Sequence, residues 1–329
     1  MTARRTISKL LNLGRRLAGT QRPIVLMYHR VAKVTADPSQ CAVAPERFAR
    51  QIDILKRDRN VVPMHWLAKQ LREGRLPRKA AAITFDDGYA DVFQNALPIL
   101  RQFGCPATVF ITTQAIGDRQ GFWWDVLSRI VLETAHLPPR LAIDLVGERR
   151  EWQLLDDRSK TTDDDAITRE ALHATLHALL KPMVPRRRAS VLDQLAAWAG
   201  TTADLRLSDR AMTAAELRQL AAADEIEIGG HTLTHPSLPL VSSHDLRHEV
   251  AQSCRDCEAM TGQPVTGFAY PFGDCNDACV QAVETSGLQY ALTTIQREIS
   301  PRTHPFRIPR ILAADWDEAD FQRKVLNHG

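Results

Sequence analysis

Short apolar runs alternate with amphipathic segments along most of the chain. The apolar runs predict buried strands at residues 23–28, 61–62, 81–85, 107–111, 226–229, 267–270 and 290–293. The segments between them have the apolar spacing of amphipathic helices, notably at residues 45–55, 65–73, 244–260 and 279–284. Because strands and helices follow one another in turn, the pattern predicts an α/β protein with a parallel sheet or barrel.

This alternation is interrupted in the middle of the chain. Residues 126–207 contain candidate helices at 167–180 and 190–198 and a possible hairpin around Gly147. The charged runs at 163–165 and 186–188 are interpreted as solvated surface without a function. About eighty residues are too many for a simple crossover between two strands, so we interpret this stretch as an insertion, where substrate selectivity would be sought.

Composition narrows the class of protein. The 329 residues are 44% hydrophobic and 25% charged, which is typical of a folded globular protein, and the net charge of +3 gives no sign of general nucleic-acid binding. Six cysteines are too few for a disulfide framework in a chain of this length. Cys254 and Cys257 lie on the apolar stripe of a predicted helix, which favours a place in the core over a zinc site with Cys275 and Cys279.

The first twenty residues form a basic amphipathic segment. Lys9 and the pair Arg15 and Arg16 interrupt its apolar residues, so it lacks the apolar run of a secretory signal, and no later segment is long and apolar enough to span a bilayer. The segment either lies on an anionic membrane surface or is a solvated leader helix. We therefore expect a cytoplasmic protein with possible peripheral membrane contact, and the sequence does not indicate its oligomeric state.

Two predicted strand ends carry groups suited to a metal. Asp86 and Asp87 follow an apolar strand, and their side chains point in different directions on an extended backbone, so one can bind a metal while the other acts as a base. His231 and His235, four residues apart, follow another strand. Each motif alone also suits a helix cap or a surface turn, but two histidines and a carboxylate together suit zinc or a similar divalent metal.

These two motifs and a third resemble those of one family. Residues 84–88 (Thr-Phe-Asp-Asp-Gly) and 231–235 (His-Thr-Leu-Thr-His) are similar to the first and second motifs of the polysaccharide deacetylases of the NodB-homology type, carbohydrate esterase family four, and residues 268–273 resemble the third. Further similarity lies at residues 27–31, 106–110, 122–125 and 306–311. The resemblance implies a deformed (β/α) barrel of fewer than eight regular units, formed by residues 21–329 and interrupted at about 126–207.

The resemblance also implies roles for individual residues. Asp87, His231 and His235 would hold a divalent metal, usually Zn²⁺, which activates water and polarises the amide carbonyl. Asp86 would be the catalytic base, and the backbone N–H of Phe272 would stabilise the oxyanion. The remaining candidates are substrate-binding residues that offer an apolar wall to a sugar ring: Tyr270, Pro271 and Phe272, with Trp124 from another motif.

Two positions depart from the family pattern. Ala269 stands where many members have an arginine that pairs with the base, so Arg310 or Arg30 is expected to supply that charge. The usual late histidine that serves as general acid has no clear match, which leaves His29, at the end of a strand, and His304 as candidates.

The function implied by this resemblance is metal-dependent hydrolysis of the N-acetyl amide of an amino-sugar glycan, as in exopolysaccharide biosynthesis, which releases acetate and a free amine. One alternative is deformylation or deacetylation of a lipid-linked sugar, suggested by the basic N-terminal segment. The other is a non-catalytic carbohydrate-binding relative, which would have no need for an intact set of metal ligands and base.

Overall fold

The computed structural model describes residues 21–117, 121–145, 147–155, 166–204 and 206–326. The basic N-terminal segment and the acidic run at 163–165 lie outside the described residues, so their interpretations stay predictions. No helix in the described part of the chain has both the length and the apolar character needed to cross a membrane.

The centre of the molecule is a parallel sheet. Its strands are β1 (Ile24–Tyr28), β2 (Asn60–Val61), β3 (Ala80–Phe85), β4 (Ala107–Ile111), β7 (Ile226–Gly230), β8 (Gly267–Ala269), β9 (Tyr290–Leu292) and β10 (Ile311–Leu312). The order is β10-β1-β3-β4-β7-β8-β9, with β2 beside β3. Every residue of β1, β3 and β4 is buried, because both faces of a parallel sheet are covered, which explains the continuous apolar runs in the sequence.

The sheet curls into a nearly closed, deformed barrel. Ile308 forms a bridge with Leu292 at the β9 edge, and Ile311 pairs with Leu26 of β1 at the other edge. The segment 308–312 therefore joins the two edges and places Arg310 inside the seam, fully buried. The predicted deformed barrel is confirmed.

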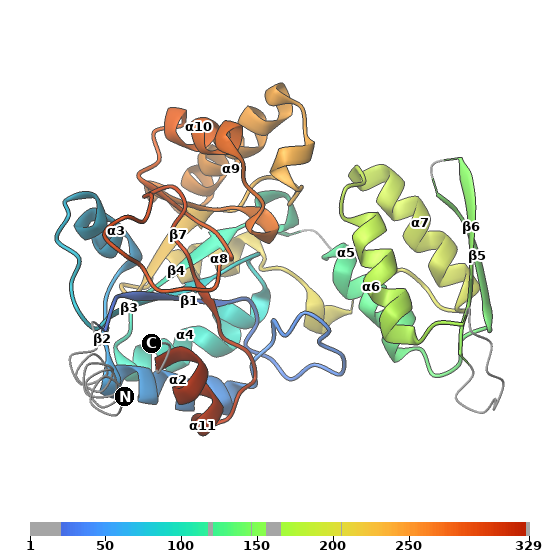
Figure 1. Cartoon of the computed structure of the whole chain (residues 1–329), viewed down its shortest axis with the longest axis horizontal. Helices are drawn as coiled ribbons and strands as arrows, with labels where there is room; N and C mark the ends of the chain where they lie inside the picture. Colours follow the sequence, from blue (N-terminus) through green and yellow to red (C-terminus); the bar gives the residue numbers. More distant parts are fainter. Residues whose placement is uncertain (1–20, 118–120, 146, 156–165, 205, 327–329) are drawn as a thin grey trace, which may run out of the picture.

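Helices cover the outside of the barrel (Figure 1). They are α2 (Pro45–Asp58), α3 (Met64–Arg72), α4 (Leu97–Phe103), α8 (Ala214–Ala221), α9 (Ser243–Thr261), α10 (Asp277–Thr285) and α11 (Glu318–Phe321). Short turns of 3₁₀ or π geometry occur at Val92–Ala96, Thr113–Ala115, Arg129–Glu133, Leu207–Asp209, Leu238–Leu240, Pro271–Gly273 and Gln322–Leu326. Cys254 and Cys257 on α9 are buried in the main core, as their place on the apolar stripe predicted.

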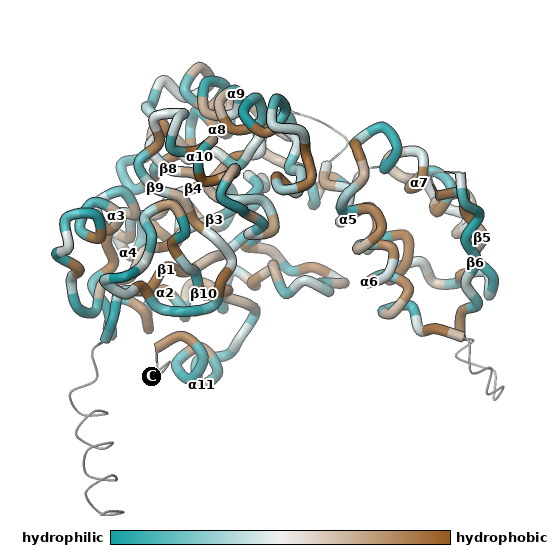
Figure 2. The backbone as a smooth tube through the Cα atoms, turned by 45° about the horizontal axis from the view of Figure 1, so that its top comes forward, coloured by the Kyte–Doolittle hydropathy of each residue, from teal (hydrophilic) through white to brown (hydrophobic). Residues whose placement is uncertain are grey.

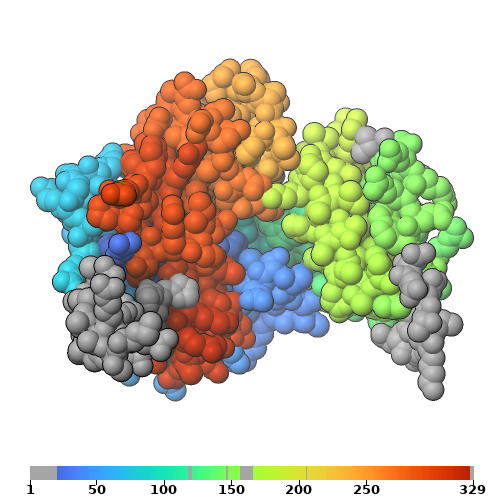
Figure 3. All heavy atoms as spheres, viewed as in Figure 1, coloured from blue at the N-terminus to red at the C-terminus, as the bar shows by residue number. Residues whose placement is uncertain are grey.

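The insertion forms a lobe that stands beside the barrel (Figures 1 and 3). We call its elements the insertion lobe: α5 (Trp123–Ser128), β5 (Arg140–Leu145), β6 (Glu148–Gln153), α6 (Arg169–Leu180) and α7 (Pro185–Trp198). β5 and β6 form the predicted hairpin, with β6 on the hydrophilic outer edge (Figure 2). The lobe has its own hydrophobic cluster, in which Leu172, Leu176 and Leu195 are fully buried.

One interpretation of the lobe sequence is wrong. The basic run 186–188 is not uniformly solvated, since Arg186 and Arg187 are exposed but Arg188 is only 6% exposed. The reason is that α7 begins at Pro185, a residue suited to a first helical turn, earlier than the predicted start. On the resulting helix Arg188 falls on the same side as Val191, Leu192 and Leu195, which face the lobe core.

Candidate active site and metal centre

The two motifs meet at the carboxyl-terminal end of the barrel. Asp86 and Asp87 directly follow β3, and His231 directly follows β7, with only β4 between these strands in the sheet. All carboxyl ends of a parallel sheet lie at one edge, so residues far apart in sequence converge there. His235 reaches the same point because the chain turns after His231.

Asp87, His231 and His235 form a buried cluster. One oxygen of Asp87 (Oδ1) lies 3.4 Å from His231 Nε2 and 3.3 Å from His235 Nε2. One potential ligand atom from each residue lies within 4.8 Å of the other two. In the part of the chain that the structure describes, this is the one such group of three.

The chemistry of this cluster fits a divalent metal. His231 Nδ1 lies 2.7 Å from the carbonyl oxygen of Ala269, which holds the proton on Nδ1 and leaves Nε2 free as a ligand. Asp87 Oδ1 and His235 Nδ1 are buried without a hydrogen-bond partner. A buried polar atom without a partner is costly, and a metal would remove this cost at the carboxylate.

Burial and neighbouring charges shift the pKa values of the three residues in this cluster. Burial opposes ionisation of Asp87, but the neighbouring histidines, His231 above all, lower its pKa overall. Burial lowers the pKa of His235 to about 3, so this imidazole is neutral. For His231 burial also opposes the charged form, but the carboxylates of Asp86 and Asp87 outweigh it and raise the pKa.

Strained backbone is concentrated at this site. Asp87 (φ 73°), Thr232 (φ 67°), His235 (φ 56°) and Phe272 (φ 60°) adopt the left-handed conformation that residues other than glycine rarely take. Of the non-glycine residues that the structure describes, only Gln40 and Lys79 share it. Because such strain persists only where surrounding contacts enforce it, its location marks a functional site.

Asp86 is paired with a buried arginine. Arg310 Nη1 donates to Asp86 Oδ1 at 2.7 Å, and Arg310 Nη2 donates to Oδ2 at 2.6 Å. Burial opposes ionisation of Asp86, but the Arg310 charge and hydrogen bonds lower its pKa well below the ordinary value. The arginine is held by the carbonyl oxygen of Thr293, to which its Nε donates at 3.0 Å. Asp86 is thus an oriented carboxylate.

Of the two arginine candidates, only Arg310 reaches Asp86. Arg30 instead donates to Asp91 and Asp209, each at 2.9 Å, so of the two alternatives the structure brings Arg310, and not Arg30, to Asp86. Three carboxylates surround it, the third being Asp125 at 3.9 Å, and they hold its guanidinium away from Asp86.

The two candidate general acids lie in different surroundings. His29 Nε2 is 4.0 Å from Asp86 Oδ2, and its Nδ1 is buried without a partner. His304 is exposed, and its Nδ1 accepts a hydrogen bond from the backbone N–H of Phe306. The structure therefore brings His29, but not His304, to the carboxylate.

The expected apolar wall is only partly present. The Phe272 ring lies edge-on to His235, with centroids 4.5 Å apart, and the Trp124 ring lies 4.7 Å from the same histidine. Tyr270 is fully buried and its hydroxyl donates to the Phe306 carbonyl, and Pro271 is buried as well. Neither can offer a surface to a sugar, because β8 directs Tyr270 into the main core.

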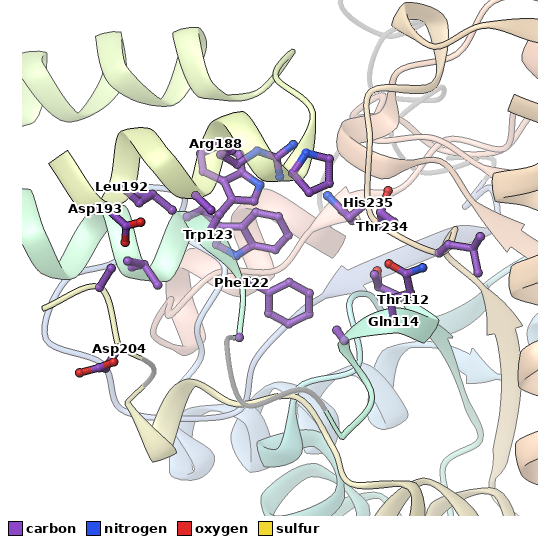
Figure 4. Close-up of a pocket in the computed structure, with 18 residues that line it drawn as sticks. Thr112, Gln114, Phe122, Trp123, Arg188, Leu192, Asp193, Asp204, Thr234 and His235 are labelled. Carbon is purple, nitrogen blue, oxygen red and sulfur yellow. The ribbon is translucent and has the colours of Figure 1, made fainter. Parts of the chain in front are cut away.

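A cavity of about 500 Å³ extends from His235 to the insertion lobe (Figure 4). The barrel contributes Thr112, Gln114 and Thr234, and the lobe contributes Trp123, Trp124 and Arg188. This volume is typical of a ligand site and is lined by aromatic and polar groups together. The sequence motifs did not indicate that residues of the barrel and of the lobe line one cavity.

Two supporting groups were missed by the sequence analysis. Glu249 on α9 accepts hydrogen bonds from the backbone N–H groups of Leu233 (2.8 Å) and Thr234 (3.0 Å), which fixes the loop between the two histidines. Tyr89 donates to Asp125 and accepts from Trp124 Nε1, both at 2.7 Å. Glu249 had a detectable signal, since it is an acid beside Val250 on the apolar side of a predicted helix.

The sequence of the chain is similar to those of known polysaccharide deacetylases. The family model described as polysaccharide deacetylase matches residues 73–137 and 166–291. A poly-β-1,6-N-acetyl-D-glucosamine N-deacetylase of Staphylococcus epidermidis is 24% identical over 324 residues, which cover 91% of this chain and 85% of that protein. A protein of the same name from Staphylococcus aureus is 28% identical over 119 residues, which cover 32% of this chain and 41% of that protein.

Solved structures share the fold. IcaB from Ammonifex degensii aligns with a TM-score of 0.59 at 16% identity, covering 92% of this chain and 95% of that one. BC0361, a polysaccharide deacetylase from Bacillus cereus, aligns with a TM-score of 0.57 at 16% identity, covering 92% of this chain and 69% of that one.

Proposed function

Because the chain belongs to the polysaccharide deacetylase family, a family of amide-hydrolysing enzymes, we propose that it removes N-acetyl groups from a glycan built of β-1,6-linked N-acetylglucosamine. The substrate follows the names of the two staphylococcal relatives. The observation that carries the proposal is the convergence of the Asp86–Arg310 pair and the Asp87, His231 and His235 cluster at the carboxyl-terminal end of the barrel, where His235 also lines the cavity.

We assign the cofactor as one divalent metal ion, Zn²⁺, held by Asp87, His231 and His235. When bound, such a metal supplies Lewis acidity that polarises the amide carbonyl and makes water more acidic. Carboxylate and imidazole ligands in a site of this size also suit other first-row metals, so metal content is part of the test.

The chain's own residues perform the proton transfers. Asp86 accepts the proton of the attacking water, and Arg310 keeps its carboxylate ionised and correctly oriented between turnovers. His29, next to Asp86, donates a proton to the nitrogen that leaves as the amine. The backbone N–H of Phe272 stabilises the oxyanion, while the rings of Phe272 and Trp124 exclude water around the acetamide.

The decisive experiment compares the wild-type protein with Asp86→Asn. Acetate and formate release are measured from oligomers of β-1,6-linked N-acetylglucosamine and from other N-acylated sugars, together with bound metal. We expect acetate release by the wild type and a loss of about 100-fold or more in the variant, because it lacks the base. Metal content should be unchanged, since Asp87 still provides the carboxylate ligand.

Two results would contradict the proposal. A variant that retains wild-type turnover would exclude Asp86 as the base. A wild-type protein that binds metal but releases no acetate from any N-acetylated sugar would exclude deacetylation itself.

A further inference from the structure

Arg188 of the insertion lobe is a buried cation without a carboxylate partner. It is 6% exposed, and its Nη2 donates to the carbonyl oxygen of Met183 at 2.7 Å. Among the described residues, its Nε has no hydrogen-bond partner and its guanidinium forms no ion pair. Burial lowers the pKa of this guanidinium to about 10, which still leaves it charged at neutral pH.

A second unpartnered donor lies directly beside it. The Arg188 guanidinium carbon lies 4.8 Å from the centroid of the Trp123 ring, and Trp123 Nε1 is also buried without an acceptor. Buried donors in native proteins are nearly always paired, because leaving one unpaired costs about 1–3 kcal/mol. Two such donors from two different helices, α5 and α7, indicate a place built for an acceptor.

Both residues line the cavity that ends at His235 (Figure 4). A chain of aromatic contacts joins the two ends, since the centroid of Trp124 lies 5.5 Å from that of Trp123 and 4.7 Å from that of His235. A molecule whose acetamide lies at His235 can therefore extend along this wall to Arg188.

The acidic residues of the same cavity do not satisfy Arg188. Asp193 and Asp204 also line it, but both are exposed and neither forms an ion pair with the guanidinium. Their charges are screened by water, whereas the buried guanidinium acts in a medium of lower dielectric constant. The cavity thus has one buried cationic group, Arg188, while the acidic groups that line it are exposed.

We propose that Arg188 and Trp123 form a subsite for an anionic oxygen group, a carboxylate or a phosphate, carried by the glycan that is deacetylated. A guanidinium can donate two parallel hydrogen bonds to a carboxylate or a phosphate, and the neighbouring indole N–H is a third hydrogen-bond donor. The proposal rests on the proposed function in one respect, that the substrate occupies this cavity. A carboxylate would come from a uronic acid or an acidic substituent, and a phosphate from a phosphodiester or a lipid-linked sugar.

Binding of simple anions tests the subsite. The metal-loaded protein is titrated with inorganic phosphate and with glucuronate, using calorimetry and tryptophan fluorescence. Arg188→Met keeps the length of the side chain and removes its charge and donors, and the exposed neighbour Arg187→Met is the matched control. We expect Kd to rise about 10- to 100-fold in Arg188→Met and to stay unchanged in Arg187→Met.

Two further variants keep the test valid if Arg188→Met does not fold. Arg188→Lys retains the charge without the planar fork, and Trp123→Phe retains the ring without the donor, so each should weaken binding by a smaller factor. The anion with the lower Kd, phosphate or glucuronate, shows whether the substrate carries a phosphate or a carboxylate. Equal anion affinity in the wild type and in all these variants, or no binding of either anion, overturns the proposal.

Acetate release separates this inference from the proposed function. If the wild type releases acetate and prefers oligomers that carry a carboxylate or phosphate, and Arg188→Met loses this preference, both stand. If the wild type binds anions through Arg188 but releases no acetate, the proposed deacetylation is contradicted and the proposed anion subsite is supported. If acetate is released but Arg188→Met changes neither anion binding nor preference, the subsite fails alone.

Discussion

Arg310 supplies the guanidinium that pairs with Asp86, whereas the family pattern has an arginine at this point of the third motif. Here that position is Ala269, and its carbonyl oxygen lies 2.7 Å from His231 Nδ1. The guanidinium instead comes from the seam of the barrel, where it donates two hydrogen bonds to Asp86. Asp86 is therefore oriented by a residue of the segment between β9 and β1, from a different part of the sequence than the third motif.

The general acid is tested by two single variants. His29→Ala should lower kcat by about 100-fold, because it removes the group next to Asp86 that would protonate the leaving amine. His304→Ala should leave kcat within about twofold of the wild type, since that side chain is exposed and separate from the carboxylate. The measurement is steady-state acetate release by both variants. Wild-type rates in both would remove His29 from the mechanism.

Asp125 is a partly buried carboxyl in an acidic neighbourhood. Burial raises its pKa to about 7, and the charges of Asp209 and Asp87 add to this rise, while Arg30 and the Tyr89 hydroxyl oppose it. In the unfolded chain the same group ionises near its ordinary pKa of about 4. Between these values the folded protein holds a proton that the unfolded chain has released.

The stability of the protein should therefore depend on pH through this group. Because the folded state binds more protons than the unfolded state between pH 4 and 7, the stabilisation is present at low pH and is lost as the pH rises. Compared with Asp125→Asn, the wild type should lose up to about 4 kcal/mol over this interval. Denaturant unfolding of both proteins in chelator at several pH values measures the difference. A difference that is independent of pH would contradict the assignment.

At the level of elements, the end of α6 contacts the loop that carries the third motif. Lys181 Nζ lies 2.7 Å from Asp274 Oδ2 and 4.3 Å from the centroid of the Phe272 ring. Ser237, two residues after His235, donates to the same carboxylate at 2.7 Å. One lysine of the insertion lobe thus joins the loop of Phe272 to the loop of the second motif.

Loss of this contact should affect turnover more than stability. Lys181→Met keeps the apolar stem and removes the charge, and a partly exposed ion pair contributes only about 0–1 kcal/mol to stability. We expect kcat/KM for the glycan to fall about 10-fold, because a small displacement of Phe272 misplaces the substrate. Kinetics, Tm and metal content are measured, with Lys181→Arg as the control that restores the charge. A fall in Tm that matches the loss of activity would indicate a purely structural role.

In the described part of the chain, the largest hydrophobic cluster lies in the barrel, the insertion lobe has a cluster of its own, and two smaller clusters accompany them. The proposed metal ligands all lie in the barrel, at the ends of β3 and β7, and Asp87 and His231 are 144 positions apart in the sequence. A metal bound there would stabilise the folded barrel because the unfolded chain does not bring these ligands together.

Removal of the metal should lower the stability of the barrel. At a metal concentration about 1,000 times Kd the stabilisation is about 4 kcal/mol, which corresponds to a rise in Tm of about 5–10 °C. Scanning calorimetry with and without chelator measures it. Asp87→Asn is the control, since asparagine tolerates the left-handed φ of 73° but lacks the charge. A chelator effect of equal size in this variant would place the metal elsewhere.

The sequence by itself determined most strands of the barrel and the residue types of the candidate reaction centre, but not the short strand β10 or the helices α8 and α11. Apolar runs located the buried strands, and the first two motifs named Asp86, Asp87, His231 and His235, because local spacing and residue type are sufficient for both. The family itself could be identified from motif order, since that information is linear.

Only the tertiary structure decided which distant residues meet. That Arg310 and not Arg30 pairs with Asp86 depends on how the sheet closes at residues 308–312. That Tyr270 faces the core, and that Arg188 lines the cavity, depends on strand direction and on where a helix begins. These outcomes follow from contacts between segments far apart in the chain, and a pattern of neighbouring residues does not encode them.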